Sequence, residues 1–127
     1  MSAVTADVQH FIAVNIDSAE QLEVLLLLHR HPGRGWHAHD VSREIFTVPA
    51  AATLRLESLV ELGFLRSDGA ADPEYRYQPR SEEQAAGVQA LADAYRANRV
   101  GVLSFVFRRP PDPVRSFSDA FRIRRDG

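Results

Sequence analysis

The chain has 127 residues, of which 45% are hydrophobic and 25% charged, a composition typical of one soluble globular domain with its own core. It contains no cysteine, which excludes disulfides and thiolate metal sites. No signal peptide or membrane-length apolar run is found, so a cytoplasmic protein without membrane contact is expected. The formal net charge of −2 argues against nucleic-acid binding by overall charge alone.

Two helices are expected at the start of the chain. Residues 4–16 place apolar side chains at helical spacing and predict a short helix. A second helix is predicted from residue 18 to about Arg30, opened by a capping box of Ser18 and Gln21. Apolar residues occur on nearly all sides of it, which predicts a helix buried on more than one side.

The stretch from Trp36 to Gln78 has the most specific pattern, because helical periodicity changes to period-two alternation at Gly63. The first helix of this stretch is expected to bury Val41, Ile45 and Phe46. The predicted elements are a helix over 38–46, a tight turn over 47–49, a helix over 50–62, and strands over 64–67 and 75–78 that flank a polar turn. Two helices joined by a three-residue turn and followed by a hairpin make a winged helix-turn-helix.

Residues 18–79 resemble the DNA-binding domain of bacterial winged-helix transcriptional regulators. The resemblance rests on HDVSREIFTVPAAATLRLESLVELGFLRSDG followed by EYRY, at the places of helix, turn, recognition helix and wing. It covers about half of the chain and implies that residues 35–37 form a short strand paired with the wing. His37 replaces the Ser or Thr that usually caps the helix after this strand, with Asp40 three residues further on.

The C-terminal third is expected to dimerise. A capping box of Ser81 and Gln84 opens a long helix that reaches at least Asn98. Continuation through Gly101 is favoured over a strand at residues 102–107, where β-branched and aromatic residues gather. The predicted dimer seam has heptad-like spacing and contains Val88, Leu91, Tyr95, Asn98, Val102 and Phe105.

A short last helix is expected after the break at residues 108–111. Asp112 caps it, Pro113 occupies its first turn, and Val114, Phe117 and Phe121 form an apolar stripe that must dock on the body or on a partner subunit. The tail is locally basic and either contacts phosphates or forms a solvated helix face. Its arginines are Arg108, Arg109, Arg115, Arg122, Arg124 and Arg125.

The resemblance implies that the start of the recognition helix faces the major groove and that the wing lies against the DNA backbone. Only Arg55 offers a bidentate contact to guanine, whereas Glu57 and Glu61 repel phosphate. The alternative is that Leu54 and the neighbouring Ala50 and Ala51 form a protein-docking face. The candidate DNA-binding residues are Thr53, Leu54, Arg55, Ser58, Arg66 and Arg76.

No other chemistry is indicated. The pairs His29/His31 and His37/His39 flank one loop with Asp40 adjacent, and imidazole and carboxylate suit Zn²⁺ or Ni²⁺, so a metal-responsive regulator is a third hypothesis. Two histidines separated by one residue on a helix point in different directions, however, and no metal or other cofactor is expected. No phosphate loop, nucleophile elbow or catalytic triad is found, so the protein is not expected to be an enzyme.

The sequence thus predicts a mostly α-helical winged helix-turn-helix with a small β-hairpin wing and helical extensions at both ends. The expected parts are an N-terminal helix (1–17), the winged helix-turn-helix domain (18–79), and a long helix with a short terminal helix (80–127). The leading function is a transcription-regulatory protein that binds double-stranded DNA as a homodimer. The alternative is a winged-helix module that binds another protein without reading DNA sequence.

Overall fold

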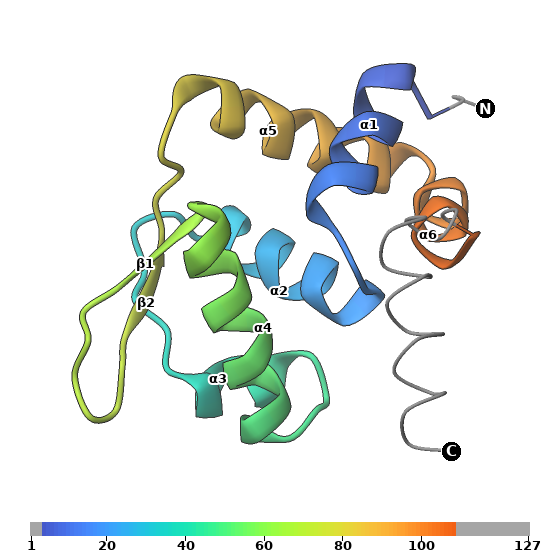
Figure 1. Cartoon of the computed structure of the whole chain (residues 1–127). Helices are drawn as coiled ribbons and strands as arrows, with labels where there is room; N and C mark the ends of the chain where they lie inside the picture. Colours follow the sequence, from blue (N-terminus) through green and yellow to red (C-terminus); the bar gives the residue numbers. More distant parts are fainter. Residues whose placement is uncertain (1–3, 109–127) are drawn as a thin grey trace, which may run out of the picture.

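The computed structural model describes residues 4–108, which form six helices and a two-stranded antiparallel hairpin. The helices are α1 (Ala6–Asn15), α2 (Ala19–Arg30), α3 (Ala38–Glu44), α4 (Pro49–Leu62), α5 (Glu82–Ala97) and α6 (Arg99–Arg108). The strands are β1 (Leu65–Ser67) and β2 (Tyr75–Tyr77). This confirms the predicted winged helix-turn-helix with helical extensions (Figure 1).

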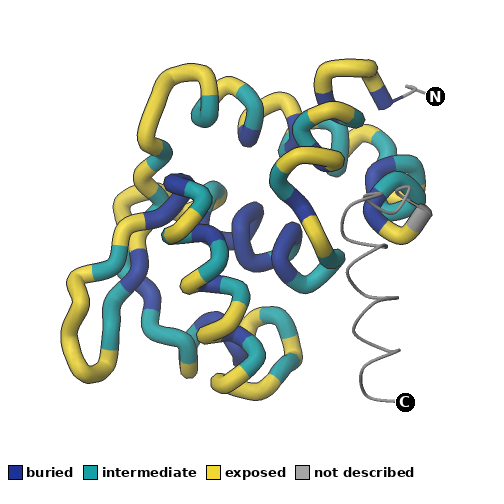
Figure 2. The backbone as a smooth tube through the Cα atoms, in the orientation of Figure 1, coloured by how far each residue is buried: buried dark blue, intermediate teal, exposed yellow. Residues whose placement is uncertain are grey.

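Helix α2 is the centre of the molecule. It contacts α4 and β2 on one side and α5 and α6 on the other (Figure 1). Its residues from Gln21 to Leu28 are buried except Glu23, as the all-round apolar pattern predicted (Figure 2). The apolar side chains of α2 cover more than one stripe of the helix surface. Other elements must therefore pack on two sides of α2 to shield these side chains from water.

The helix starts follow the expected capping chemistry with one difference. The hydroxyls of Ser18 and Ser81 accept hydrogen bonds from the backbone N–H of Gln21 and Gln84, each at 3.1 Å. The two glutamine side chains reach one residue beyond the cap and accept from the N–H of Asp17 and Arg80, each at 2.8 Å. At each helix start, one of the otherwise unpaired N–H groups is therefore satisfied by the serine hydroxyl.

The hairpin is held to the body by Trp36 and Tyr75. Leu65 pairs with Tyr77 and Ser67 with Tyr75, and Trp36 forms an isolated bridge with Tyr75 through two backbone bonds of 2.8 and 2.7 Å. The expected short strand near Trp36 is thus a single bridge. Gly63 ends α4 in the left-handed conformation at φ +93°, which glycine adopts without steric penalty, and directs the chain into β1.

The prediction of one helix running from Ser81 through Gly101 was wrong. Helix α5 ends at Ala97, and Asn98 adopts φ −151° and ψ 71° before α6 begins. The side-chain oxygen of Asn98 accepts from the N–H of Gly101 at 3.0 Å and caps α6. Residues 102–107 are helical, as favoured, but they lie in a separate helix that folds back on the body and contacts α1 and α2.

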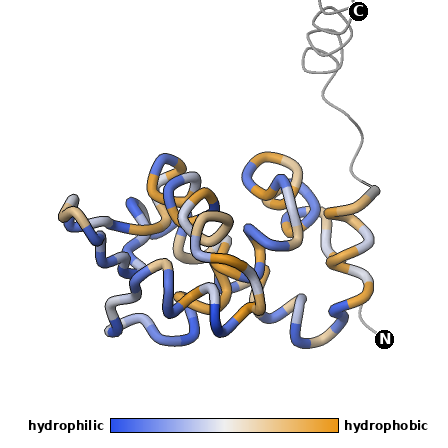
Figure 3. Tube along the Cα trace, turned by 90° about the horizontal axis from the view of Figure 1, so that it is seen from below, coloured by the Kyte–Doolittle hydropathy of each residue, from blue (hydrophilic) through white to orange (hydrophobic). Residues whose placement is uncertain are grey.

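Apolar and polar residues alternate along the described helices, as amphipathic helices packed around one core require (Figure 3). Within residues 4–108, no helix has the length and apolar character needed to cross a membrane. The expected terminal helix, with Val114, Phe117 and Phe121, lies outside the described residues, as do the tail arginines beyond Arg108.

Candidate nucleic-acid interface

The outward face of α4 is the face of the helix-turn-helix that the rest of the described chain leaves uncovered. On the opposite face, Ala52, Leu56 and Leu59 are fully buried. The buried residues and the exposed residues of α4 each recur at helical spacing. The sequence therefore divides α4 into a packed face and a free face. The free face consists of Ala50, Thr53, Leu54, Glu57 and Glu61.

The turn before α4 adds two exposed apolar residues. Phe46 was predicted to be buried in α3, but α3 ends at Glu44 and Phe46 is 95% exposed. Its φ is +59°, a left-handed conformation that is unfavourable for a bulky residue. Val48 is 61% exposed and Leu54 67% exposed. We refer to Phe46, Val48 and Leu54 together as the apolar patch.

Neither Phe46 nor Val48 was identified as a surface residue from the sequence. Val48 directly precedes Pro49, the first residue of α4, and so stands at the helix N-cap, where Ser, Thr, Asp or Asn is preferred. It makes no side-chain cap hydrogen bond. An apolar residue at a cap position was therefore the available signal for an exposed apolar side chain in this turn.

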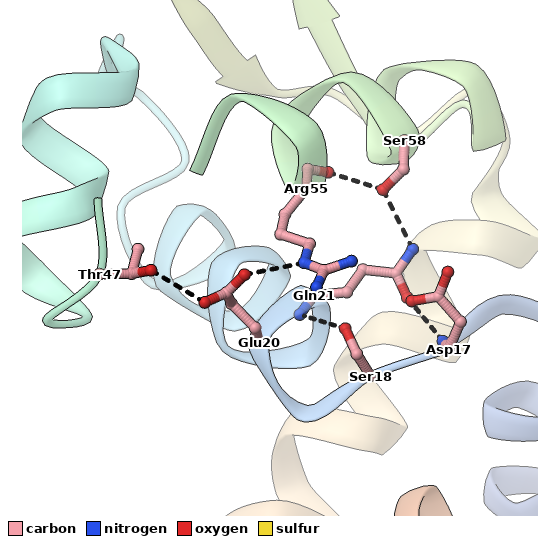
Figure 4. Close-up of polar contacts among 7 residues, drawn as sticks. All are labelled: Asp17, Ser18, Glu20, Gln21, Thr47, Arg55 and Ser58. Atoms are coloured by element: carbon pink, nitrogen blue, oxygen red, sulfur yellow. Dashed lines mark hydrogen bonds and ion pairs between the residues drawn. The ribbon is translucent and has the colours of Figure 1, made fainter. Parts of the chain in front are cut away.

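A polar network fixes the side of α4 that faces α2 (Figure 4). Glu20 accepts a hydrogen bond from Arg55 Nε at 2.9 Å and another from the Thr47 hydroxyl at 3.0 Å. The bond from Arg55, with its charge, lowers the pKa of Glu20. Gln21 donates to the Ser58 hydroxyl at 3.2 Å, and that hydroxyl donates to the Arg55 carbonyl at 2.8 Å.

This network separates the four candidate residues on α4 into two groups. Arg55 and Ser58 are half-buried and bonded to α2 residues, so Arg55 must leave Glu20 to reach a guanine. Thr53 and Leu54 are exposed on the free face. The Thr53 hydroxyl donates to the Pro49 carbonyl at 2.9 Å, which leaves its oxygen able to accept a further bond.

The hairpin carries the remaining two candidates. Arg66 is exposed on β1 and makes no ion pair among the described residues. Arg76 donates to Glu74 Oε1 and to the Gly33 carbonyl, each at 2.9 Å. The hairpin turn is acidic, and its Asp68 accepts from the N–H groups of Ala70 and Glu74, which lowers the pKa of Asp68.

Two contacts fix the hairpin relative to the helices. The Tyr75 hydroxyl donates to the Glu57 carboxylate on α4, and burial is the first reason that the pKa of Tyr75 is raised. The His37 ring lies 3.0 Å from the Pro73 carbonyl and 3.5 Å from an Asp72 carboxylate oxygen, and the Pro73 bond is the main reason that the pKa of His37 is raised. The hairpin is therefore held against α4 by one contact and against the start of α3 by the other.

The histidines are used separately. His29 lies 3.3 Å from Gln89 Oε1 and edge-on to Tyr77, and His31 packs against Trp36. The His37 amide donates to Asp40 at 3.3 Å, while the His37 ring turns to the hairpin. Within residues 4–108, no three His, Asp or Glu residues are grouped to hold a metal ion.

The predicted dimer seam is largely used inside the single chain. Val88, Leu91 and Val102 are fully buried in the core, because the break at Asn98 turns α6 back onto the body. Tyr95 and Phe105 are half-buried, and the Tyr95 hydroxyl donates to Glu23 at 3.2 Å. The large apolar residues exposed in this region are Val14, Val100 and Phe107, which are 61%, 76% and 72% exposed.

No protein-family model and no curated protein sequence matches the chain. Among solved structures, it is similar to the YusO protein from Bacillus subtilis, with a TM-score of 0.54 and 15% identity over 94% of this chain and 80% of that one. The transcriptional regulator MosR of M. tuberculosis gives 0.54 and 14% over 94% and 82%. A MarR-family transcriptional regulator from Rhodococcus sp. RHA1 gives 0.51 and 18% over 94% and 81%.

The chain has the winged-helix fold of MarR-type regulators. This confirms the predicted architecture. The similarity covers 94% of the chain and is therefore not limited to the central domain. With sequence identities below 20%, the structural similarity establishes the fold alone. It leaves the roles of individual side chains open. What this MarR-type fold binds must be argued from its own residues.

Proposed function

We propose that the protein is a cytoplasmic, non-enzymatic transcription regulator that binds double-stranded DNA as a homodimer. The observation that carries this proposal is the uncovered outer face of α4 beside a hairpin fixed to the same helix. Helix α4 enters the major groove, where Thr53 bonds a base edge or phosphate and Leu54 and Ala50 touch thymine methyl groups. Arg66 contacts the DNA backbone from the wing.

Phosphate contacts by this surface are few. Arg55 and Arg76 are bonded to Glu20 and Glu74, and the free face of α4 carries Glu57 and Glu61. Binding by so few cations has a shallow salt dependence, because each neutralised phosphate contributes a slope of about −0.9 in log affinity against log salt. Base and methyl contacts must therefore supply much of the specificity.

Fluorescence anisotropy with labelled genomic duplex tests the proposal. We expect binding at low salt that Arg66→Ala weakens about equally for all sequences, with a salt slope reduced by about one. The matched control is Arg96→Ala on α5, where the arginine pairs with Asp93 at 2.7 Å. Absence of duplex binding by the wild type at low salt contradicts the proposal.

The homodimer in this proposal is assigned to the exposed apolar residues of α1 and α6. Val14, Val100 and Phe107 are the positions in this region that a partner copy must cover, with half-buried Tyr95 and Phe105 beside them. Val88, Leu91 and Val102 contribute indirectly by holding α5 and α6 in place. Asn98 acts as the α6 cap rather than as a register-setting residue between subunits.

A second candidate function is protein binding through the apolar patch. The observation in its favour is that Phe46, Val48 and Leu54 are all largely exposed, while the free face of α4 carries no arginine. Leu54→Asp then abolishes co-purification of a partner. If that variant still captures the partner, the second candidate is wrong.

A further inference from the structure

The carboxylate of Glu20 connects three parts of the helix-turn-helix. Glu20 lies on α2, and its Oε1 accepts the hydrogen bond from Arg55 Nε on α4 at 2.9 Å (Figure 4). Its Oε2 accepts from the hydroxyl of Thr47, in the turn before α4, at 3.0 Å. Each carboxylate oxygen therefore has its own partner, and only one of these partners is charged.

Arg55 is the single basic residue of the turn and of α4. No other arginine, lysine or histidine occurs between residues 44 and 65, a stretch that contains both. The free face of α4 carries the acidic residues Glu57 and Glu61. How strongly this part of the surface attracts a polyanion therefore depends on what the guanidinium of Arg55 contacts.

The bond to Glu20 uses only part of the guanidinium group. A guanidinium has five N–H donors in a fixed plane, and Arg55 donates to Glu20 from Nε alone. Within residues 4–108, its two terminal nitrogens have no hydrogen-bond or ion-pair partner. The side chain is 33% exposed, so an anion in solution can approach it.

Arg55 lies at the border between the two faces of α4. Successive residues of a helix are about 100° apart, so Arg55 lies between exposed Leu54 and fully buried Leu56. When a helix enters the major groove, its outermost residues meet base edges and its flanks lie beside the phosphate backbone. The border position therefore suits a phosphate contact better than a base contact.

We propose that duplex DNA competes with Glu20 for Arg55, and that on binding Arg55 exchanges the carboxylate for a backbone phosphate. Glu20 is then a positioning residue, which holds the only cation of α4 against α2 in the free protein. This exchange rests on the DNA-binding function proposed above. The pair in the free chain does not depend on that function.

The exposure of the pair and the charge of DNA favour this exchange. The side chains of Arg55 and Glu20 are 33% and 30% exposed, so water screens their attraction. Duplex DNA carries one negative charge for about every 1.7 Å of its axis, so Arg55 beside the backbone meets several phosphates in place of one carboxylate. After the exchange, Glu20 keeps its bond from Thr47. Glu20 therefore weakens duplex binding without preventing it.

Fluorescence anisotropy with random duplex tests the competition. Glu20→Gln keeps the shape of the side chain and removes its charge, and we expect it to tighten duplex binding several-fold. In the Arg55→Ala background, most of that gain should disappear, because no cation remains to be released. Glu61→Gln is the matched control, since Glu61 has no ion pair among the described residues and its effect should be the same in both backgrounds.

Two outcomes of the anisotropy series overturn the proposal. An equal gain from Glu20→Gln with and without Arg55 shows that the two residues do not compete through this pair. Arg55→Ala alone should weaken binding to all sequences and reduce the salt slope by about one. A loss confined to duplexes with guanine at one position assigns Arg55 to a base and overturns the phosphate contact.

Nitrogen-15 NMR of the arginine side chains tests the pair in the free chain. The Arg55 Nε–H signal, identified by its absence in Arg55→Ala, should be protected from exchange with water in the wild type. Glu20→Gln should remove this protection, and added duplex should shift the signal. An unprotected signal in the wild type overturns the proposal and leaves DNA binding in place. A protected signal with no duplex binding by any variant overturns the DNA function, and the exchange with it, so the two failures are distinguishable.

Discussion

At the scale of single residues, Phe46 shows a conflict between stability and contact. It is a bulky residue in a conformation that suits glycine, and its side chain makes little use of the core that lies behind the turn. Natural chains retain such positions where function requires them. The turn between α3 and α4 is therefore the place where removal of a side chain should not destabilise the protein.

We expect Phe46→Gly to raise the free energy of unfolding by up to about 1 kcal/mol, because relief of left-handed strain outweighs the greater freedom of glycine in the unfolded chain. Urea denaturation followed by circular dichroism measures the change. Phe46→Ala is the control, since it removes the ring but retains a Cβ at positive φ and gains nothing. A loss of stability in the glycine variant would show that Phe46 packs on the body.

The ion pair between Glu20 and Arg55 predicts an acid-sensitive contribution to stability. The pKa of Glu20 lies below its ordinary value of 4.5, mainly because of the bond from Arg55, so the pair stabilises above that pH and the effect is lost as pH falls through the lowered pKa. Each side chain is about one-third exposed, which limits the contribution. Glu20→Gln should cost about 0.5–1 kcal/mol at pH 7 and little at pH 3, by urea denaturation at both values.

Glu61→Gln provides the matched control for this pH dependence. It removes the same charge from the free face of α4, where Glu61 has no ion-pair partner among the described residues. Its unfolding free energy should follow the wild type at both pH values. Equal pH dependence in Glu20→Gln and the wild type contradicts a native role for the pair.

At the scale of secondary-structure elements, Asn98 decides how the C-terminal half folds. Its side-chain oxygen accepts a hydrogen bond from the Gly101 N–H at 3.0 Å and caps α6. The chain is helical on both sides of Asn98, so this cap marks where the second helix begins. Asn98→Ala should destabilise the protein by about 1 kcal/mol in thermal or urea unfolding. Asn98→Ser keeps an acceptor and should lose much less. Equal losses in the two variants would exclude the cap as the cause.

The hairpin is linked to the start of α3 by His37. The Pro73 carbonyl, with the carboxylates of Asp72, Asp40 and Glu74, raises the pKa of His37 above its ordinary value of 6.5. The contribution of the positive charge to this link is therefore fully present below pH 6.5 and is lost as pH rises through the raised pKa. An NMR titration of the His37 ring should give a pKa above 6.5 that Asp72→Asn lowers. Asp93→Asn on α5 should leave it unchanged, and a titration at or below 6.5 would contradict the link.

At the scale of the whole molecule, the exposed residues of α1 and α6 predict the assembly. Phe107→Asp combined with Val100→Asp places two charges on the surface assigned to the partner copy, and we expect light scattering to show half the wild-type mass. Leu54→Asp is the matched control on the opposite part of the molecule and should leave the mass unchanged. A wild-type mass of one chain at all concentrations contradicts the dimer.

Much of the fold could be predicted from the sequence because its signals are local. The serine caps, the Gly63 helix end, the all-round apolar α2 and the hairpin alternation each depend on residues within a few positions of one another. The candidate site was predicted in part: Thr53, Leu54 and Arg66 are exposed where the pattern placed them. Helical spacing alone determines which side of α4 faces outward.

Only the tertiary structure decided which charges and apolar residues remain available. Arg55 is bonded to Glu20, which lies 35 positions earlier in the chain, and no local pattern reports such a pairing. Val88, Leu91 and Val102 have the spacing of a dimer seam, yet the break at Asn98 turns the same residues into the core of one chain. The sequence determined the elements and their apolar faces, whereas the choice of what each face meets depends on long-range packing, which residue spacing does not encode.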